Sequence, residues 1–258
     1  MLVKLVCAVC CLLWTQGFSQ PIRPHANAHA HNDYEHVRPL LDALQNGFIS
    51  VEADIHFRNG RLVVDHTIAS GKSPLLERLY LKPLDSLLRM NNGEIYSSST
   101  GNMTFFLMLD VKTTAEPAWE ALKQLLKTYS SLCNSKGIRI FLSGNRPIQV
   151  IQKEQNSCVG VDGRPDDLGK NYPETFMPVI SDHYKNWSKW NGKTTPTDND
   201  LAGIRELALR VHKEGKRLRL WSIPDNEMAW DALLKAGVDL INTDRLEELN
   251  VFLTKKDL

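Results

Sequence analysis

The chain has 258 residues, of which 42% are hydrophobic and 24% charged, and this suits one large globular domain better than two. A net charge of +1 and the lack of a long basic run give no electrostatic case for binding nucleic acid. Any phosphate chemistry must therefore come from a local site.

The N-terminus has the pattern of a secretory signal peptide. Lys4 precedes the apolar run from Leu5 to Trp14, and Gly17-Phe18-Ser19 places small residues at the −3 and −1 positions of a cleavage site. The run is too short to span a bilayer as a helix. We expect residues 1–19 to be removed, residues 20–258 to form the mature domain, and the protein to be secreted or periplasmic. An uncleaved anchor is the alternative.

Two cysteines remain in this mature chain, Cys133 and Cys158. In an oxidising compartment they could pair and close a loop of moderate length. Two buried free thiols are an equally good interpretation, because the sequence does not place their Cα atoms. Neither cysteine has the spacing of a metal knuckle.

The first half of the mature chain alternates strand and helix patterns. The predicted strands are 26–31, 48–57, 62–65 and 104–111, and the predicted helices are 37–46, 81–90 and 115–133. Asn59-Gly60 predicts a tight hairpin between the second and third of these strands. The segment 104–111 is almost continuously apolar, as expected for a strand buried on both faces.

The second half continues the alternation. The predicted strands are 137–142, 159–162, 177–181, 217–223 and 238–242, and the predicted helices are 148–155, 201–214, 228–236 and 246–253. Eight strands, with the hairpin return left out, mostly alternate with helices and predict a single (β/α)₈ TIM barrel. An open doubly wound sheet is the alternative, but no glycine-rich phosphate fingerprint follows the first strand.

Polar residues gather where these strands end, which is where barrels of this kind place their active sites. They are His31, Asn32, Glu52, Asp54, His66, Asp110, Lys112, Asn145, Arg146, Arg164, His183, Arg219, Trp221 and Asp244. Chance would scatter these residue types over the strands and helices instead.

Three of these residues form a predicted metal site. Glu52 and Asp54 are two apart on a strand, so both side chains point to the same face, and Asp110 ends an apolar strand. Inward carboxylates are costly unless a cation compensates them, and an all-oxygen set suits Mg²⁺ or Ca²⁺ better than Zn²⁺. The alternative is a solvated strand end with salt bridges to Lys112 and Arg219.

His31 and His66 flank this predicted site and are the candidate acid and base, because paired imidazoles can move protons in both directions near neutral pH. His29 shares a strand face with His31 and is the alternative base. We expect four other histidines on the surface: His25, His36, His56 and His212.

The remaining strand-end residues are candidates for binding the substrate: Asn32, Lys112, Asn145, Arg164, Arg219 and Trp221. Lys112 could hold a phosphate oxygen as a point charge. The arginines could do the same, as could Arg146, or they could pair with the carboxylates. Trp221 could pack a substrate chain or fill the barrel.

The sequence resembles the PLC-like phosphodiesterase superfamily. The order His31, Glu52-Ala53-Asp54 and Gly60 to His66 is similar to that of the glycerophosphodiester phosphodiesterases. The Glu-Ala-Asp strand and Asp110-Val111-Lys112 resemble sphingomyelinase D-type phospholipases, and Ala232 to Asp244 resembles the family's closing strand. His31-Asn32-Asp33-Tyr34 is similar to an exported PI-PLC-like branch with a His-Asn-Asp-Tyr motif.

The resemblance implies a barrel of PLC-like type, one Mg²⁺ or Ca²⁺ held by Glu52, Asp54 and Asp110, and acid–base catalysis by His31 and His66. It implies hydrolysis of glycerophosphodiesters or phospholipid headgroups, with transient membrane-surface contact and no obligatory protein partner. The family's His-Arg-Gly opening is absent, and so is the cysteine loop after the second histidine, which leaves the substrate open. A phospholipase D-like lyase that forms a cyclic phosphate and a barrel that binds phosphate ligands without turnover are the alternatives.

Overall fold

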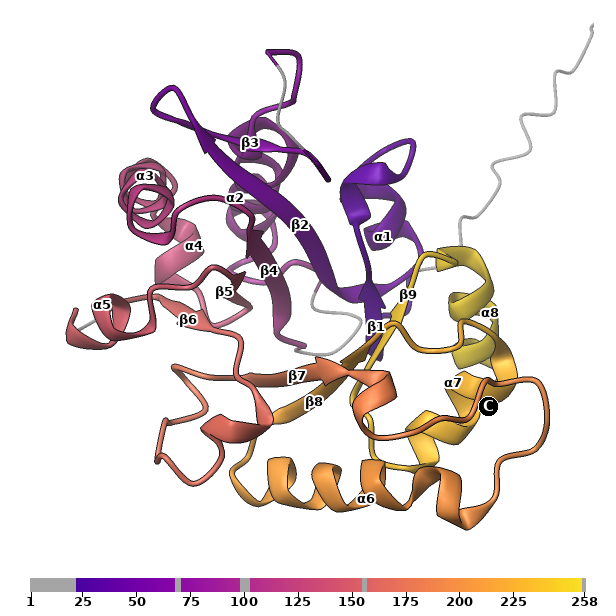
Figure 1. Cartoon of the computed structure of the whole chain (residues 1–258). Helices are drawn as coiled ribbons and strands as arrows, with labels where there is room; N and C mark the ends of the chain where they lie inside the picture. The colour runs from indigo at the N-terminus through magenta and orange to yellow at the C-terminus, as the bar shows by residue number, and fades with distance from the viewer. Residues whose placement is uncertain (1–21, 68–70, 98–102, 155–156, 257–258) are drawn as a thin grey trace, which may run out of the picture.

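The parallel strands of the chain curve into a nearly closed barrel, with most of the helices on its outside (Figure 1). The computed structural model describes residues 22–67, 71–97, 103–154 and 157–256. The parallel strands are β1 (His25–Ala30), β2 (Phe48–Arg58), β4 (Phe105–Val111), β5 (Ile138–Gly144), β6 (Val159–Val161), β7 (Val179–His183), β8 (Arg217–Trp221) and β9 (Leu240–Thr243). The predicted (β/α)₈ barrel is therefore confirmed.

The strands follow one another in the order β6-β5-β4-β2-β1-β9-β8-β7. Gly163 pairs in parallel with Ile180 and donates its N–H to the carbonyl of Val179, which narrows the gap between the two ends of the sheet. β3 (Arg61–Val64) pairs antiparallel with β2. Asn59 and Gly60 both have positive φ, as a two-residue hairpin turn requires.

The α-helices are α1 (Leu41–Gln45), α2 (Lys82–Met90), α3 (Ala115–Thr128), α4 (Ser131–Asn134), α5 (Ile148–Lys153), α6 (Asp198–Lys213), α7 (Glu227–Lys235) and α8 (Leu246–Lys256). Shorter helical turns are η1 (Asp33–Glu35), η2 (Glu77–Leu81), η4 (Pro165–Asp167) and η5 (Tyr184–Asn186). Residues 162–178, all of them described, carry only η4 between β6 and β7 and no α-helix. Within the described ranges, the helices are too short or too polar to cross a membrane.

Some element bounds differ from those expected, for local reasons. The first helix begins only at Leu41, because Leu40 has a φ of 64° and donates its N–H to Asp33. The expected helix 115–133 is divided into α3 and α4. The helix after the long loop begins earlier than expected, at Asp198, because Thr197 and Asp200 form a capping box.

Apolar residues fill the barrel beneath its C-terminal mouth. Phe106 and Met108 alternate with Asp110 on one face of β4, so they lie below that carboxylate along the strand. They form a buried cluster with Ile49, Phe141, Val179 and Leu240. The polar side chains of the site thus lie directly above a layer of apolar side chains.

Two of the histidines expected on the surface are buried instead. His25 bonds to Asn250 Oδ1 through Nε2, and His56 bonds to the carbonyl of Asp65 through Nε2. Their places in β1 and β2 put them inside the fold, where each has a hydrogen-bond partner. His36 is half-buried and His212 is exposed.

Cys133 and Cys158 form a disulfide, with their Cα atoms 5.1 Å apart. The bond joins α4 to the residue just before β6, so it lies at the N-terminal end of that strand and away from the strand ends that carry the site. This decides the alternative that the sequence left open. The predicted signal peptide, residues 1–19, lies outside the described residues.

Candidate phosphodiesterase site

A cavity of about 300 Å³ opens at the C-terminal ends of the strands. It is lined by His31, Asn32, Glu52, His66, Asp110, Lys112, Ser143, Gly144, Arg164, Arg219 and Trp221. Most of the predicted site residues are therefore brought together around one space, with Asp54 buried beside it.

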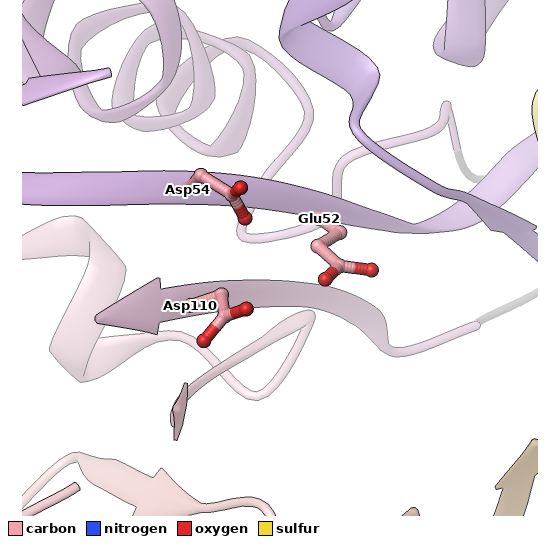
Figure 2. A group of neighbouring side chains, drawn as sticks. All are labelled: Glu52, Asp54 and Asp110. Atoms are coloured by element: carbon pink, nitrogen blue, oxygen red, sulfur yellow. The ribbon is translucent and has the colours of Figure 1, made fainter. Parts of the chain in front are cut away.

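Three carboxylates converge on this cavity from two neighbouring strands. Asp54 on β2 is paired in register with Asp110 on β4, and Glu52 precedes Asp54 by two residues on the same strand face. One oxygen of each carboxylate lies within 4.8 Å of the others. Figure 2 shows the three side chains reaching toward the same space between the strands.

The carboxylate cluster fits a hard divalent cation. Among the described residues, Asp54 Oδ1 and Asp110 Oδ1 are buried and have no hydrogen-bond partner. Lys112 Nζ lies 2.5 Å from Asp110 Oδ2 and 3.1 Å from Asp54 Oδ2, as the salt-bridge alternative expects, but it leaves those two oxygens unused. Buried carboxylate oxygens without donors are the ligands that Mg²⁺ and Ca²⁺ prefer.

The surroundings of Asp54 disfavour the negative charge of its carboxylate. Burial raises the pKa of Asp54 against the pull of Lys112, and the negative charges of Asp110 and Glu52 raise it further. A cation at this position would relieve both effects.

Glu52 is held in place by two partners. Arg219 pairs with its carboxylate, and His29 Nε2 lies 3.3 Å from the same oxygen, Oε2. Burial opposes the ionisation of Glu52, but Arg219 and His29 outweigh it and lower its pKa to about 2. Arg219 also donates through Nε to Asn242.

His29 lies beneath the cavity, where it contacts Glu52. It is fully buried, bonds to Ser50 Oγ at 2.7 Å, and does not line the cavity. Burial and then the charge of Arg219 lower the pKa of His29 to about 4, so it stays neutral at pH 7. Of the two candidate histidines, His31 is the one that reaches the substrate space.

His31 is oriented by a carboxylate from the last strand. Its Nδ1 lies 2.7 Å from Asp244 Oδ1, which leaves Nε2 for proton transfer in the cavity. Burial alone would lower the pKa of His31, but the bond to Asp244 and the charge of Glu52 raise it above its ordinary value. The pair has the arrangement of an imidazole held in one tautomer by an acid.

His66 lies next to Asp54 of the carboxylate cluster. Its Nδ1 lies 3.3 Å from Asp54 Oδ2 and 3.1 Å from the hydroxyl of Tyr34. More than half of the His66 side chain, 56%, is exposed, so its other nitrogen is accessible to substrate. His31 and His66 thus both combine a positioned Nδ1 with an open Nε2.

Most of the residues predicted to bind substrate line the cavity. Asn32 has a left-handed backbone that turns the chain into the mouth, and Trp221 packs edge-on against His183 with ring centres 4.2 Å apart. Asn145 is the exception. Gly144, with a φ of 63°, turns the chain away, and the Asn145 side chain is exposed and donates to the carbonyl of Thr113.

Sequence reasoning gave no role to several residues that support this site. The sequence marks Asp244 only as a polar residue at the end of a strand. Because the barrel closes with β9 beside β1, Asp244 lies next to His31. Tyr34 contacts His66. Asp33 is buried and accepts from the N–H of Leu40 and from the hydroxyl of Tyr80. The sequence motif marks these positions, but it does not show which partner each side chain contacts.

Comparison with known proteins identifies related families. Residues 16–157 match the model of the AIM6-like phosphodiesterase domain, and residues 217–247 match that of the glycerophosphoryl diester phosphodiesterase family. A curated relative, altered inheritance of mitochondria protein 6 of Kluyveromyces lactis, is 31% identical, covering 92% of this chain and 74% of the relative.

A second relative, the altered inheritance of mitochondria protein 6 homolog of Arthroderma benhamiae, is 25% identical over 84% of this chain and 80% of its own length. Among solved structures, a glycerophosphodiester phosphodiesterase from Parabacteroides distasonis superposes with a TM-score of 0.55 at 15% identity. The superposition covers 91% of this chain and 100% of that one, and it shows a shared fold.

Proposed function

The chain belongs to the AIM6-like phosphodiesterase family, and we propose that it is a phosphodiester hydrolase that uses one divalent cation and a pair of histidines. The observation that carries this proposal is the convergence of three carboxylates and two positioned imidazoles on one polar cavity. A protein that only binds phosphate needs the cation but not two proton-transfer groups.

Glu52, Asp54 and Asp110 would hold the cation, for which we propose Mg²⁺ or Ca²⁺. When bound, such a cation offsets the negative charge that builds up on the phosphoryl oxygens. Lys112 would exchange part of its contact with the carboxylates for a phosphate oxygen, and Arg219 keeps Glu52 ionised and in position.

The two histidines divide the proton transfers. One imidazole takes the proton of the attacking hydroxyl or water through Nε2, and the other gives a proton to the departing alkoxide. Asp244 holds the His31 ring in its tautomer, and Asp54 and Tyr34 do the same for His66. Each ring therefore presents the same nitrogen to the substrate in every turnover.

The substrates that we propose are glycerophosphodiesters or phospholipid headgroups. A cavity of about 300 Å³ with a mostly polar and charged lining suits a polar headgroup, while acyl chains would remain outside it. Asn32, Arg164 and Trp221 would contact the headgroup. Transient contact with a membrane surface would deliver a lipid substrate, and neither nucleic acid nor an obligatory protein partner is part of the proposal.

We also propose that the protein is secreted or periplasmic. The disulfide between Cys133 and Cys158 supports this, because such bonds persist in oxidising compartments.

The histidine roles are tested by turnover of glycerophosphodiesters with identification of the products. His31→Ala and His66→Ala should each lower kcat by about 10²- to 10⁴-fold. His212→Ala is the matched control, because His212 pairs with Asp239 outside the cavity. Equal activity in all three variants would refute the acid–base assignment. The products also separate hydrolysis from release of a cyclic phosphate.

A further inference from the structure

The cavity wall formed by β5 and β6 is positively charged beyond what the reacting phosphate requires. Arg164 follows β6 and lines the cavity together with Ser143 and Gly144 at the end of β5. In the strand order, β6 lies across the barrel from β1, which carries His31. Arg164 therefore lines the side of the cavity opposite His31.

The Arg164 side chain is held in place by an ion pair with a buried carboxylate. Its NH1 lies 2.6 Å from Asp162 Oδ2, and Asp162, which is fully buried, also accepts from the hydroxyls of Ser143 and Ser181. One third of the Arg164 side chain, 33%, remains exposed. A guanidinium fixed in this way presents its remaining donors with little loss of entropy on binding.

A second guanidinium stands behind this wall without a close partner. Arg146 follows Gly144 by two residues, and its Nε and NH1 are buried with no hydrogen-bond partner among the described residues. The nearest carboxylate oxygen paired with it, Asp167 Oδ2, is 3.9 Å from NH2, while Lys170 already binds Asp167 at 2.9 Å. Burial and then the like charge of Arg164 lower the pKa of Arg146, yet an arginine remains a cation.

A count of the charges on each side of the cavity shows where the excess positive charge lies. Around the reacting phosphate, a divalent cation, Lys112 and Arg219 balance the three carboxylates and the single charge of a phosphodiester. At the wall, Asp162 pairs with Arg164, and Asp167 is shared by Lys170 at 2.9 Å and Arg146 at 3.9 Å, so Arg146 has only a distant and shared counter-charge. A weakly paired buried charge is expensive and calls for one further negative charge.

We propose that this wall is an anion subsite that binds a carboxylate on one ester arm of the substrate, so that the preferred phosphodiesters carry an acidic alcohol. Arg164 contacts the carboxylate directly, and Arg146, which lies behind the wall and does not line the cavity, supplies positive charge at a distance. The inference rests on the proposed function, but it concerns binding and not turnover.

The test compares two phosphodiesters that differ by one carboxylate, glycerol 3-(methyl phosphate) and glyceric acid 3-(methyl phosphate), in calorimetric titrations of the Ca²⁺-loaded protein, with every form carrying His31→Ala to prevent turnover. A charge-assisted hydrogen bond predicts about tenfold tighter binding of the carboxylate form. Arg146→Gln and Arg164→Lys should reduce this preference to about twofold or less. Arg205→Gln, an exposed arginine paired with Asp198 on α6, should keep it.

Arg146→Gln is the safer variant, since it removes a buried charge that has no close partner and should not lower the melting temperature. Equal affinity for the two esters when both arginines are present, or a preference that survives in both variants, would overturn the subsite. Lack of turnover when His31 is retained and metal is added, with the charge preference intact, would instead count against the hydrolase and leave the subsite standing.

Discussion

At the scale of single residues, the four positions from His31 to Tyr34 have four different tasks. His31 faces the cavity, Asn32 turns the chain with a left-handed backbone, Asp33 anchors the loop from inside, and Tyr34 contacts His66. Only part of this motif therefore lines the cavity, and the rest holds the loop in place.

The pair of His31 and Asp244 leads to a pH prediction. Asp244 raises the pKa of His31, so Asp244→Asn should lower it and move the limb of the pH–rate profile that His31 controls to lower pH. The imidazole titration of His31, followed by NMR, should move in the same direction. Asp239→Asn, which alters a His–Asp pair outside the cavity, is the control and should move neither.

Asp33 makes stability depend on pH with the opposite sign to most carboxylates. Burial raises its pKa to about 6 from 3.8, so the folded protein binds the proton more tightly than the unfolded chain does. Its contribution is fully present below pH 3.8 and is lost as the pH rises through about 6. Asp33→Asn should remove this dependence.

The measurement is the difference in unfolding free energy between the unchanged protein and Asp33→Asn, from urea denaturation at several pH values. Between pH 4 and pH 7 the unchanged protein should lose about 2 kcal/mol relative to the variant. A difference that does not vary with pH would mean that Asp33 is not protonated more readily in the fold.

At the scale of elements, the strand ends bring the site together and the turns after them aim its side chains. Gly144 shows this most clearly, because a Cβ there would lie 2.1 Å from Asp110 Oδ1. The turn after β5 must approach the carboxylate on β4 this closely for both to line the cavity.

Gly144→Ala should therefore displace Asp110 and weaken divalent-cation binding. Gly60→Ala is a matched control, since Gly60 also has a positive φ, 76°, but a Cβ there would meet nothing within 4 Å. Backbone strain should cost each variant about 1 kcal/mol of stability, and Gly144→Ala should lose more because its Cβ would also lie 2.6 Å from the backbone oxygen of Val111. Only Gly144→Ala should lower the metal affinity in a calorimetric titration, and equal affinities in the two variants would contradict this role.

At the scale of the whole molecule, the sequence predicted the barrel and the main site because strand-end residues converge by topology alone. The alternation of strands and helices was sufficient to place Glu52, Asp54 and Asp110 together. The alternation did not predict the direction of the Asn145 side chain, which depends on the backbone of Gly144. It also did not predict that His25 and His56 are buried. Those outcomes depend on turns and tertiary packing that leave no periodic trace.

The disulfide between Cys133 and Cys158 should stabilise the whole fold without affecting catalysis. It closes a loop with a sequence separation of 25, so replacing both cysteines by alanine should cost about 3 to 4 kcal/mol of unfolding free energy. Because the bond lies at the N-terminal end of β6, kcat at 25 °C should not change. A change in kcat without loss of stability would contradict this separation.

We propose that the carboxylate cluster holds a cation on which the hydrolysis of phosphodiesters depends. The most direct measurement is hydrolysis of a panel of glycerophosphodiesters by EDTA-treated protein, before and after addition of Mg²⁺ or Ca²⁺. We expect activity to be absent without metal, to return with either cation, and to stay absent in Glu52→Gln. Full activity in EDTA, or in Glu52→Gln without added metal, would contradict the claim.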